Sequence, residues 1–223
     1  MVGQFLDHKI QDLHNGYYNM TLLSSMRGVN QLGISKKPYV LYDIITLNAI
    51  SGNMTVTGNG TNTISAFKTS GANNWDNQIN SNTPYTAPCT IEFTKQAGVT
   101  DNSLSYAMMG WNTDPNTDAN YGTLDYTSYA YVQTSYIVYN NGISNNVSTG
   151  WDPTKRFYIS YDLSGNIKHW NGSTLLYSAS YGTGNTVYLD SSFYSVDATQ
   201  TYSGFSNIRI TKAVWNGDAY IYA

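Results

Sequence analysis

Residues 156–178 read RFYISYDLSGNIKHWNGSTLLYS, and this stretch decides the fold class. Phe157, Ile159 and Tyr161 occupy every second position, which is the period of a strand with one buried face. Two further strands are predicted at residues 166–170 and 173–178, after an Asp-Leu-Ser-Gly turn and an Asn171-Gly172 hairpin signal. Because such short connections join only antiparallel neighbours, the stretch predicts an antiparallel meander.

The same period of two recurs along most of the chain. Cys89, Ile91 and Phe93 alternate with polar residues, and a shorter alternation surrounds Ile208 and Ile210. Asn141-Gly142 adds a second hairpin signal, because type I′ turns need a positive φ at both centre residues. Many short strands without a helical crossover predict an all-β fold, with two antiparallel sheets packed as a sandwich over residues 46–223.

Composition excludes several classes of protein. Only 11% of the 223 residues are charged, and the net charge is −3 with a pI near 5.4, which argues against a nucleic-acid partner. No apolar run approaches the ~18 residues of a membrane span. Aliphatic residues are scarce, but 21 Tyr and 5 Trp supply the apolar surface that a core requires. The chain is therefore expected to fold, and to bind neither nucleic acid nor membrane.

Cysteine usage and the first residues bear on where the chain is made. Cys89 is the only cysteine, so no intrachain disulfide can form, which fits folding in a reducing cytosol. Residues 1–7 show no basic region followed by an apolar core, the pattern of a signal peptide. We therefore expect the protein to be made in a cytoplasm, even if it works outside a cell.

Residues 1–45 differ from the rest and are predicted to form a helical or extended N-terminal arm. Apolar residues follow the a/d rhythm of an amphipathic or coiled-coil helix, at Leu6, Ile10, Leu13, Tyr17 and Met20. Two heptads are too short to be stable alone. This stripe either lies on the main domain or docks on another subunit, and we expect it to serve assembly.

The residues of the common hydrolytic sites are scarce. Glu92 is the only Glu, so the Glu-x-Asp-x-Glu pattern of sandwich glucanases cannot be written, and no strand presents Asp-x-Asp. No Gly-x-Ser-x-Gly elbow or phosphate-binding Gly-x-x-x-x-Gly-Lys exists. His8, His14 and His169 lack zinc-ligand spacing, and a lone strand histidine such as His169 is expected to be structural. The sequence predicts a protein that is not an enzyme.

One loop has the spacing of a calcium site. Oxygen-bearing side chains stand at positions 1, 3, 5, 7 and 12 of the template, namely Asp114, Asn116, Asp118, Asn120 and Asp125. Ala119 replaces the glycine of position six, and Asp125 replaces the longer Glu of position twelve. The alternative is a turn held by Asx hydrogen bonds without metal, and this alternative is favoured. No other cofactor is expected.

Several stretches together resemble a known superfamily. They are WDNQINS (75–81), IEF (91–93), YAMMGWNTDP (106–115), YGTLDY (121–126), FYISYD (157–162), IKHWNG (167–172) and FSNIRI (205–210). Over residues 48–223 the chain resembles the concanavalin-A-like lectin/glucanase superfamily in its laminin-G or SPRY-like form. It is similar in particular to jelly-roll-like sandwich domains of bacteriophage fibre, tail and capsid-decorating proteins.

The resemblance implies a virion structural protein that displays a lectin-like sandwich, for host glycan attachment or as a passive coat. Its partners would be other virion proteins and further copies of itself, as in a trimer. The alternatives are a free carbohydrate-binding lectin and, less favoured, a glycoside hydrolase. Sugars stack on exposed aromatic rings, and the ligand-binding candidates are Trp111, Tyr121, Tyr126 and Trp170. The alternative for each tryptophan is packing in the core or on a sheet face.

Overall fold

The protein is an all-β sandwich in a computed structural model that describes residues 40–48, 50–96, 105–115, 118–132, 134–140, 142–147 and 150–222. The first strands are β1 (Leu47–Asn48), β2 (Met54–Thr57), β3 (Ile64–Lys68), β4 (Asn80–Ser81), β5 (Cys89–Thr94), β6 (Ala107–Asn112), β7 (Thr127–Val132) and β8 (Ser135–Asn140). The others are β9 (Ile143–Asn146), β10 (Phe157–Tyr161), β11 (Asn166–Asn171), β12 (Thr174–Ser180), β13 (Tyr188–Phe193), β14 (Gly204–Thr211), β15 (Val214–Trp215) and β16 (Tyr220–Ile221). A 3₁₀ turn, η4 (Tyr121–Thr123), lies between β6 and β7.

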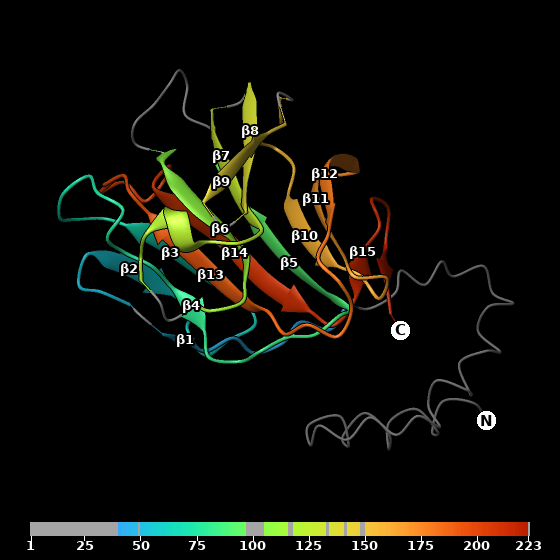
Figure 1. Ribbon diagram of the computed structural model, residues 1–223. Coiled ribbons are helices and arrows are strands. Elements are labelled where there is room, and N and C mark those ends of the chain that lie inside the picture. Colours follow the sequence, from blue (N-terminus) through green and yellow to red (C-terminus); the bar gives the residue numbers. More distant parts are fainter. Residues whose placement is uncertain are drawn as a thin grey trace, which may run out of the picture. The chain divides into compact units, whose positions relative to one another are not determined.

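Two main sheets form the two layers (Figure 1). The larger has seven strands in the order β12-β11-β10-β5-β14-β3-β2, and the smaller has five in the order β13-β6-β7-β8-β9. Every pairing within them is antiparallel. The predicted fold class, an antiparallel two-sheet sandwich, is therefore confirmed.

The meander that decided the fold class is present as β10, β11 and β12, with one change at its second turn. Asn171 pairs with Thr174, so the two loop residues are Gly172 and Ser173 rather than Asn171 and Gly172. Of these, only Gly172 has a positive φ (60°), as in a turn with glycine at its first centre position. The prediction of a type I′ turn is wrong here, because Asn171 is the last residue of β11.

The hydrophobic core fills the space between the two sheets. Trp111 of β6 is fully buried, and its Nε1–H donates to the carbonyl of Ile159 on β10 at 2.9 Å. Tyr136 of β8 stacks on Phe157 of β10 with ring centroids 5.6 Å apart. These contacts join strands of opposite sheets, so large aromatic side chains replace the scarce aliphatic ones.

Residues 41–45 belong to the sandwich, although the sequence assigned them to the N-terminal arm. Ile45 is fully buried and its N–H donates to the carbonyl of Thr61 at 2.8 Å. The hydroxyl of Thr211 on β14 donates to the carbonyl of Leu41 at 2.7 Å. The ordered sandwich therefore begins several residues before position 46. The predicted assembly residues between Leu6 and Met20 lie outside the described residues.

The outer face of the seven-stranded sheet is partly covered by the β15–β16 hairpin. Glu92 points to this face from β5, yet its side chain is only 2% exposed. The hydroxyls of Tyr42 and Tyr220 donate to its Oε2 at 2.8 and 2.6 Å, and Arg156 forms an ion pair with its Oε1. This carboxylate thus links the first and last segments of the sandwich sequence, through Tyr42 and Tyr220, to the central strand β5.

Candidate functional site

Three of the four predicted ligand-binding aromatics lie where they serve the fold. Trp111 is fully buried between the sheets, so its ring has no exposed face for a ligand, and its prediction as a stacking residue is wrong. Tyr126 is 8% exposed and packs against Tyr181 with centroids 5.1 Å apart. Trp170 is half-buried on the outer face of the other sheet, beside Gly217. Tyr121 alone belongs to a larger aromatic surface.

That surface, the aromatic platform, consists of half-buried rings in contact with one another. Its members are Trp75, Tyr106, Tyr121, Tyr129, Tyr139 and Tyr194. Trp75 contacts Tyr121, Tyr194 and Tyr129 at centroid distances of 5.2, 5.3 and 6.0 Å. Most pairs are tilted or edge-to-face, which is the favoured geometry for aromatic contacts. The six rings therefore support one another while each keeps part of its surface open.

Strand alternation places the tyrosines on the solvent side of the five-stranded sheet. In β7 and β8, Ser128 pairs with the core residue Val138, whereas Tyr129 pairs with Ile137 and Thr127 with Tyr139. Since successive side chains point to opposite faces, Tyr129 and Tyr139 face away from the core. Tyr106 and Tyr194 share this outer side, because their neighbours Ala107 and Phe193 are core residues.

Two loops complete the platform. Trp75 lies in the segment between β3 and β4, which is anchored where the N–H of Asn74 donates to the carbonyl of Tyr194 at 3.2 Å. Below it the buried Lys68 ammonium binds Asp76 at 2.5 Å and the carbonyl of Asn74 at 2.7 Å. Tyr121 begins η4, whose N-cap Asn120 accepts from the N–H of Gly122 at 2.9 Å. Hydrogen bonds within the protein thus hold the loops that carry Trp75 and Tyr121 in place without a ligand.

The oxygen-rich residues of the predicted calcium loop serve turns in the structure. Asp118 Oδ1 accepts from the N–H of Asn120 at 2.8 Å and from the hydroxyl of Thr123 at 3.0 Å. Asp125 is buried and accepts from both the N–H and the hydroxyl of Thr113. The Asp118–Asn120 bond is of the Asx type, which was the alternative to a metal, whereas the Asp125 bonds join positions twelve residues apart in the sequence.

The five candidate ligands do not form a metal site where their placement is known. Asn116 lies outside the described residues, and Asp114 is exposed. Among the described residues, no group of three or more His, Cys, Asp or Glu side chains is arranged to hold a metal ion. The calcium hypothesis therefore gains no geometric support from this loop.

One carboxyl beside this loop has an altered acidity. Asp190 of β13 is 1% exposed, and it accepts from the side-chain amide of Asn112 at 2.7 Å and from the N–H of Ser191 at 2.7 Å. Burial raises the pKa of Asp190 to about 7; its two hydrogen bonds oppose this rise, and the charges of Asp114 and Asp118 add to it. The hydroxyl of neighbouring Ser192 donates to the carbonyl of Ala119, so the loop lies over β13.

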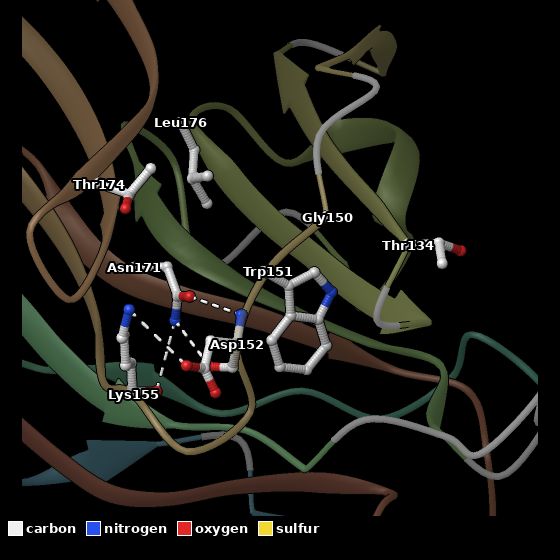
Figure 2. A pocket seen from close by; sticks show the side chains of 8 residues that line it. All are labelled: Thr134, Gly150, Trp151, Asp152, Lys155, Asn171, Thr174 and Leu176. Carbon is white, nitrogen blue, oxygen red and sulfur yellow. Dashed lines mark hydrogen bonds and ion pairs between the residues drawn. The ribbon is translucent and has the colours of Figure 1, made fainter.

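A separate pocket of about 530 Å³ is lined mainly by the 150–155 loop and by β11 and β12 (Figure 2). Its lining residues are Thr134, Gly150, Trp151, Asp152, Lys155, Asn171, Thr174 and Leu176. Asn171 fixes the 152–155 loop, because its Oδ1 accepts from the N–H of Asp152 at 2.7 Å and its amide donates to the carbonyl of Asp152 at 3.1 Å. The Lys155 ammonium lies 3.6 Å from the Asp152 carboxylate.

This pocket carries an exposed pair of opposite charges, Asp152 and Lys155. The hydroxyl and N–H of Thr154 lower the pKa of Asp152, so its carboxylate is ionised at neutral pH and is a poor proton donor. The Trp151 indole donates to the carbonyl of Val132 at 2.7 Å and packs on Phe157, which uses its polar atom and much of its surface within the protein. The pocket therefore has fewer open aromatic faces than the platform.

The structural comparisons concern the fold. No protein-family model and no curated protein sequence matches the chain. The PSpry domain of TRIM65 aligns over 76% of this chain and 89% of its own, with 12% identity and a TM-score of 0.48. The carbohydrate binding module CBM66 from Bacillus subtilis covers 78% and 99%, with 13% identity and a TM-score of 0.42. The Bacillus licheniformis β-glucanase covers 79% and 90%, with 14% identity and a TM-score of 0.40.

Five of the six platform residues were not among the sequence candidates. A partial signal was present, because Tyr129 and Tyr131 stand two apart and Tyr139 follows in the next strand. The neighbours of Trp75 in the sequence do not indicate that it belongs to the platform, since it reaches the platform through a long-range loop contact.

In the described ranges, no helix has the length and apolar character needed to cross a bilayer.

Proposed function

We propose that the protein is a glycan-binding β-sandwich module that binds sugar through the aromatic platform. One observation carries the proposal: six partly exposed rings, drawn from separate strands and loops, meet on one outer sheet face. A sandwich does not need such rings on its solvent face for its own core. Clustered exposed aromatic surface is typical of a binding site.

The chemistry of sugars matches this surface. A pyranose ring has apolar C–H faces that pack on aromatic rings, and hydroxyls at its edge that need hydrogen-bond partners. Tyrosine combines both properties, with a large apolar body and a polar tip, at a low cost in conformational entropy. Around the rings, Asp118 and Asn120 of the η4 loop supply further polar groups.

The proposal includes binding and no catalytic step. Glu92 is enclosed by two tyrosine hydroxyls and Arg156, and Asp152 keeps its charge, so neither carboxyl is suited to act as a general acid. A reducing-end assay on the glycans that the protein binds checks this directly. We expect no release of reducing sugar, and release by the full chain would contradict the proposal. Loss of that release in Asp190→Asn would assign the reaction to this buried carboxyl, whose pKa of about 7 suits a general acid.

The binding proposal is tested by applying the full chain and three variants to an array of printed glycans. Trp75→Ala removes the ring with three platform contacts, and Tyr222→Ala removes an exposed aromatic outside the platform as a matched control. We expect Trp75→Ala to lose about tenfold or more in affinity and Tyr222→Ala to keep it. Tyr121→Ala is the second platform variant, and thermal unfolding confirms that each variant folds. Full binding by both folded platform variants would contradict the proposal.

We further propose that the module is carried on a virion, as a fibre, tail or capsid-decorating component. Support comes from the resemblance of residues 48–223 to phage sandwich domains and from the apolar stripe at Leu6, Ile10 and Leu13. A density gradient of a culture that produces the protein separates this from a free lectin. A virion component sediments with the particles and resists a salt wash, whereas a free lectin stays at the top.

A further inference from the structure

The five-stranded sheet that carries the platform has no cationic side chain in its strands. Neither Lys nor Arg occurs in the sequences of β6, β7, β8, β9 or β13. The chain has none at all between Lys95 and Lys155, and none between Lys168 and Arg209. These two intervals contain all five strands, and they also contain Tyr106, Tyr121, Tyr129, Tyr139 and Tyr194. Five of the six platform rings therefore stand in segments without a positive charge.

The sixth ring has a cation nearby, but that cation is already used. Lys68 is fully buried beneath the Trp75 loop, where its ammonium binds the Asp76 carboxylate at 2.5 Å. It also donates to the carbonyl of Asn74 at 2.7 Å. A buried, paired ammonium has no free face for a ligand anion, and removing it from Asp76 would leave a charge without its partner.

The loop that holds Tyr121 adds negative charge instead. Asp118 is exposed, and its carboxylate accepts from a backbone N–H and a threonine hydroxyl, neither of which neutralises it. Asp114, in the same loop, is also exposed. These two exposed carboxylates give the Tyr121 side of the platform a negative charge.

From this charge arrangement we infer that the platform selects uncharged glycans and discriminates against sialylated, uronic or sulfated ones. Recognition of a carboxylate or sulfate needs Arg, Lys or several convergent N–H donors, and an anion near Asp118 is repelled by its exposed carboxylate. A neutral sugar meets neither obstacle, because its hydroxyls can donate to the same carboxylate. The inference rests on the proposed function, since it concerns the ligand of the same platform.

The test is an array on which each neutral oligosaccharide is printed beside its sialylated and its sulfated form. For every set that the full chain binds, we expect the neutral member to bind about tenfold or more tightly than the charged ones. Raising the ionic strength should narrow this difference, because exposed charges are screened by salt. Equal binding, or a preference for the charged member, would overturn the inference while leaving the proposed function intact. Absence of binding to every member would overturn the proposed function itself.

A charge-only variant assigns the effect to the loop. Asp118→Asn keeps an oxygen that can accept from Asn120 and Thr123, so the turn is retained while the charge is lost. We expect this variant to discriminate less between neutral and charged forms. Asp218→Asn is the matched control, because Asp218 is also exposed but follows β15 on the other sheet face. If the full chain prefers neutral glycans and Asp118→Asn shows the same preference, the Asp118 carboxylate is not its cause. That result would overturn the argument.

Discussion

Replacing Asp190 by Asn should change how stability depends on pH. In the folded protein burial raises the pKa of Asp190 to about 7, from an ordinary value of 3.8. Between these two values the folded state keeps a proton that the unfolded state has released. The contribution of Asp190 to the free energy of unfolding is therefore fully present below about pH 4, and it falls as pH rises toward 7. Three pH units at about 1.4 kcal/mol each give a loss of roughly 4 kcal/mol.

Asparagine cannot ionise, so the variant lacks this loss. Urea unfolding of the parent and Asp190→Asn, measured in parallel from pH 4 to pH 8, isolates the contribution of this one carboxyl. Burial also lowers the pKa of His169 to about 3 and that of Lys95 to about 7, so these two groups add their own pH dependence to the free energy of unfolding. Both proteins share this dependence, and it cancels in the difference between them. We expect the variant to gain up to about 4 kcal/mol relative to the parent across this range.

A chelator is present throughout, so that no divalent cation can stabilise the ionised form. A difference between the two proteins that stays constant from pH 4 to pH 8 would refute the reasoning. It would mean that Asp190 ionises in the folded protein as easily as in water. The loop over β13, which carries Tyr121, would then not shield it from solvent.

Three further variants test the packing. Trp111→Ala should cost about 3–5 kcal/mol in urea unfolding, because it leaves a cavity and removes the donor to Ile159; a cost below 1 kcal/mol would contradict full burial. His169, whose Nδ1 shares a hydrogen bond with the Tyr136 hydroxyl, stays neutral when folded; as pH falls from 6.5 to 4, the parent should therefore lose roughly 3 kcal/mol relative to His169→Gln, a change opposite in sign to that of Asp190. Glu92→Gln should cost roughly 2–3 kcal/mol and expose the β15–β16 hairpin to protease, whereas unchanged proteolysis would argue against the carboxylate as its tether.

The strands were predictable where alternation was strong and the turns were short. Residues 157–161 and 166–171 alternate clearly, and their pairing is local, so the meander followed from the sequence. The turn between β11 and β12 was misplaced by one residue because Asn171 is buried and anchors the 152–155 loop instead of forming the turn. A long-range contact of this kind leaves no trace in the local pattern.

The ligand-facing rings were harder to predict, because aromatic residues occupy both faces of the same sheet. In β6 the sequence AMMGWN is apolar or neutral at nearly every position, so nothing in it shows that Trp111 points inward. Tyr121 was found because it stands in a loop with polar neighbours. Trp75 contacts Tyr194 across more than a hundred residues of chain. Hydrogen bonds that join Asn73, Asn74 and Asn77 to residues 193–196 hold the two segments together, and only the folded structure shows this contact.

The most direct test of the platform is the NMR signal of the Trp75 indole N–H during titration with a neutral glycan that the array identifies. The chain has five tryptophans, and the Trp75→Phe variant assigns the relevant signal. We predict that the Trp75 signal shifts with saturation, while those of Trp111 and Trp215, whose indoles donate to the carbonyls of Ile159 and Gly172, stay in place. A Trp75 signal that stays unchanged at saturating glycan while the Trp151 signal moves would contradict the account and assign binding to the pocket of Figure 2.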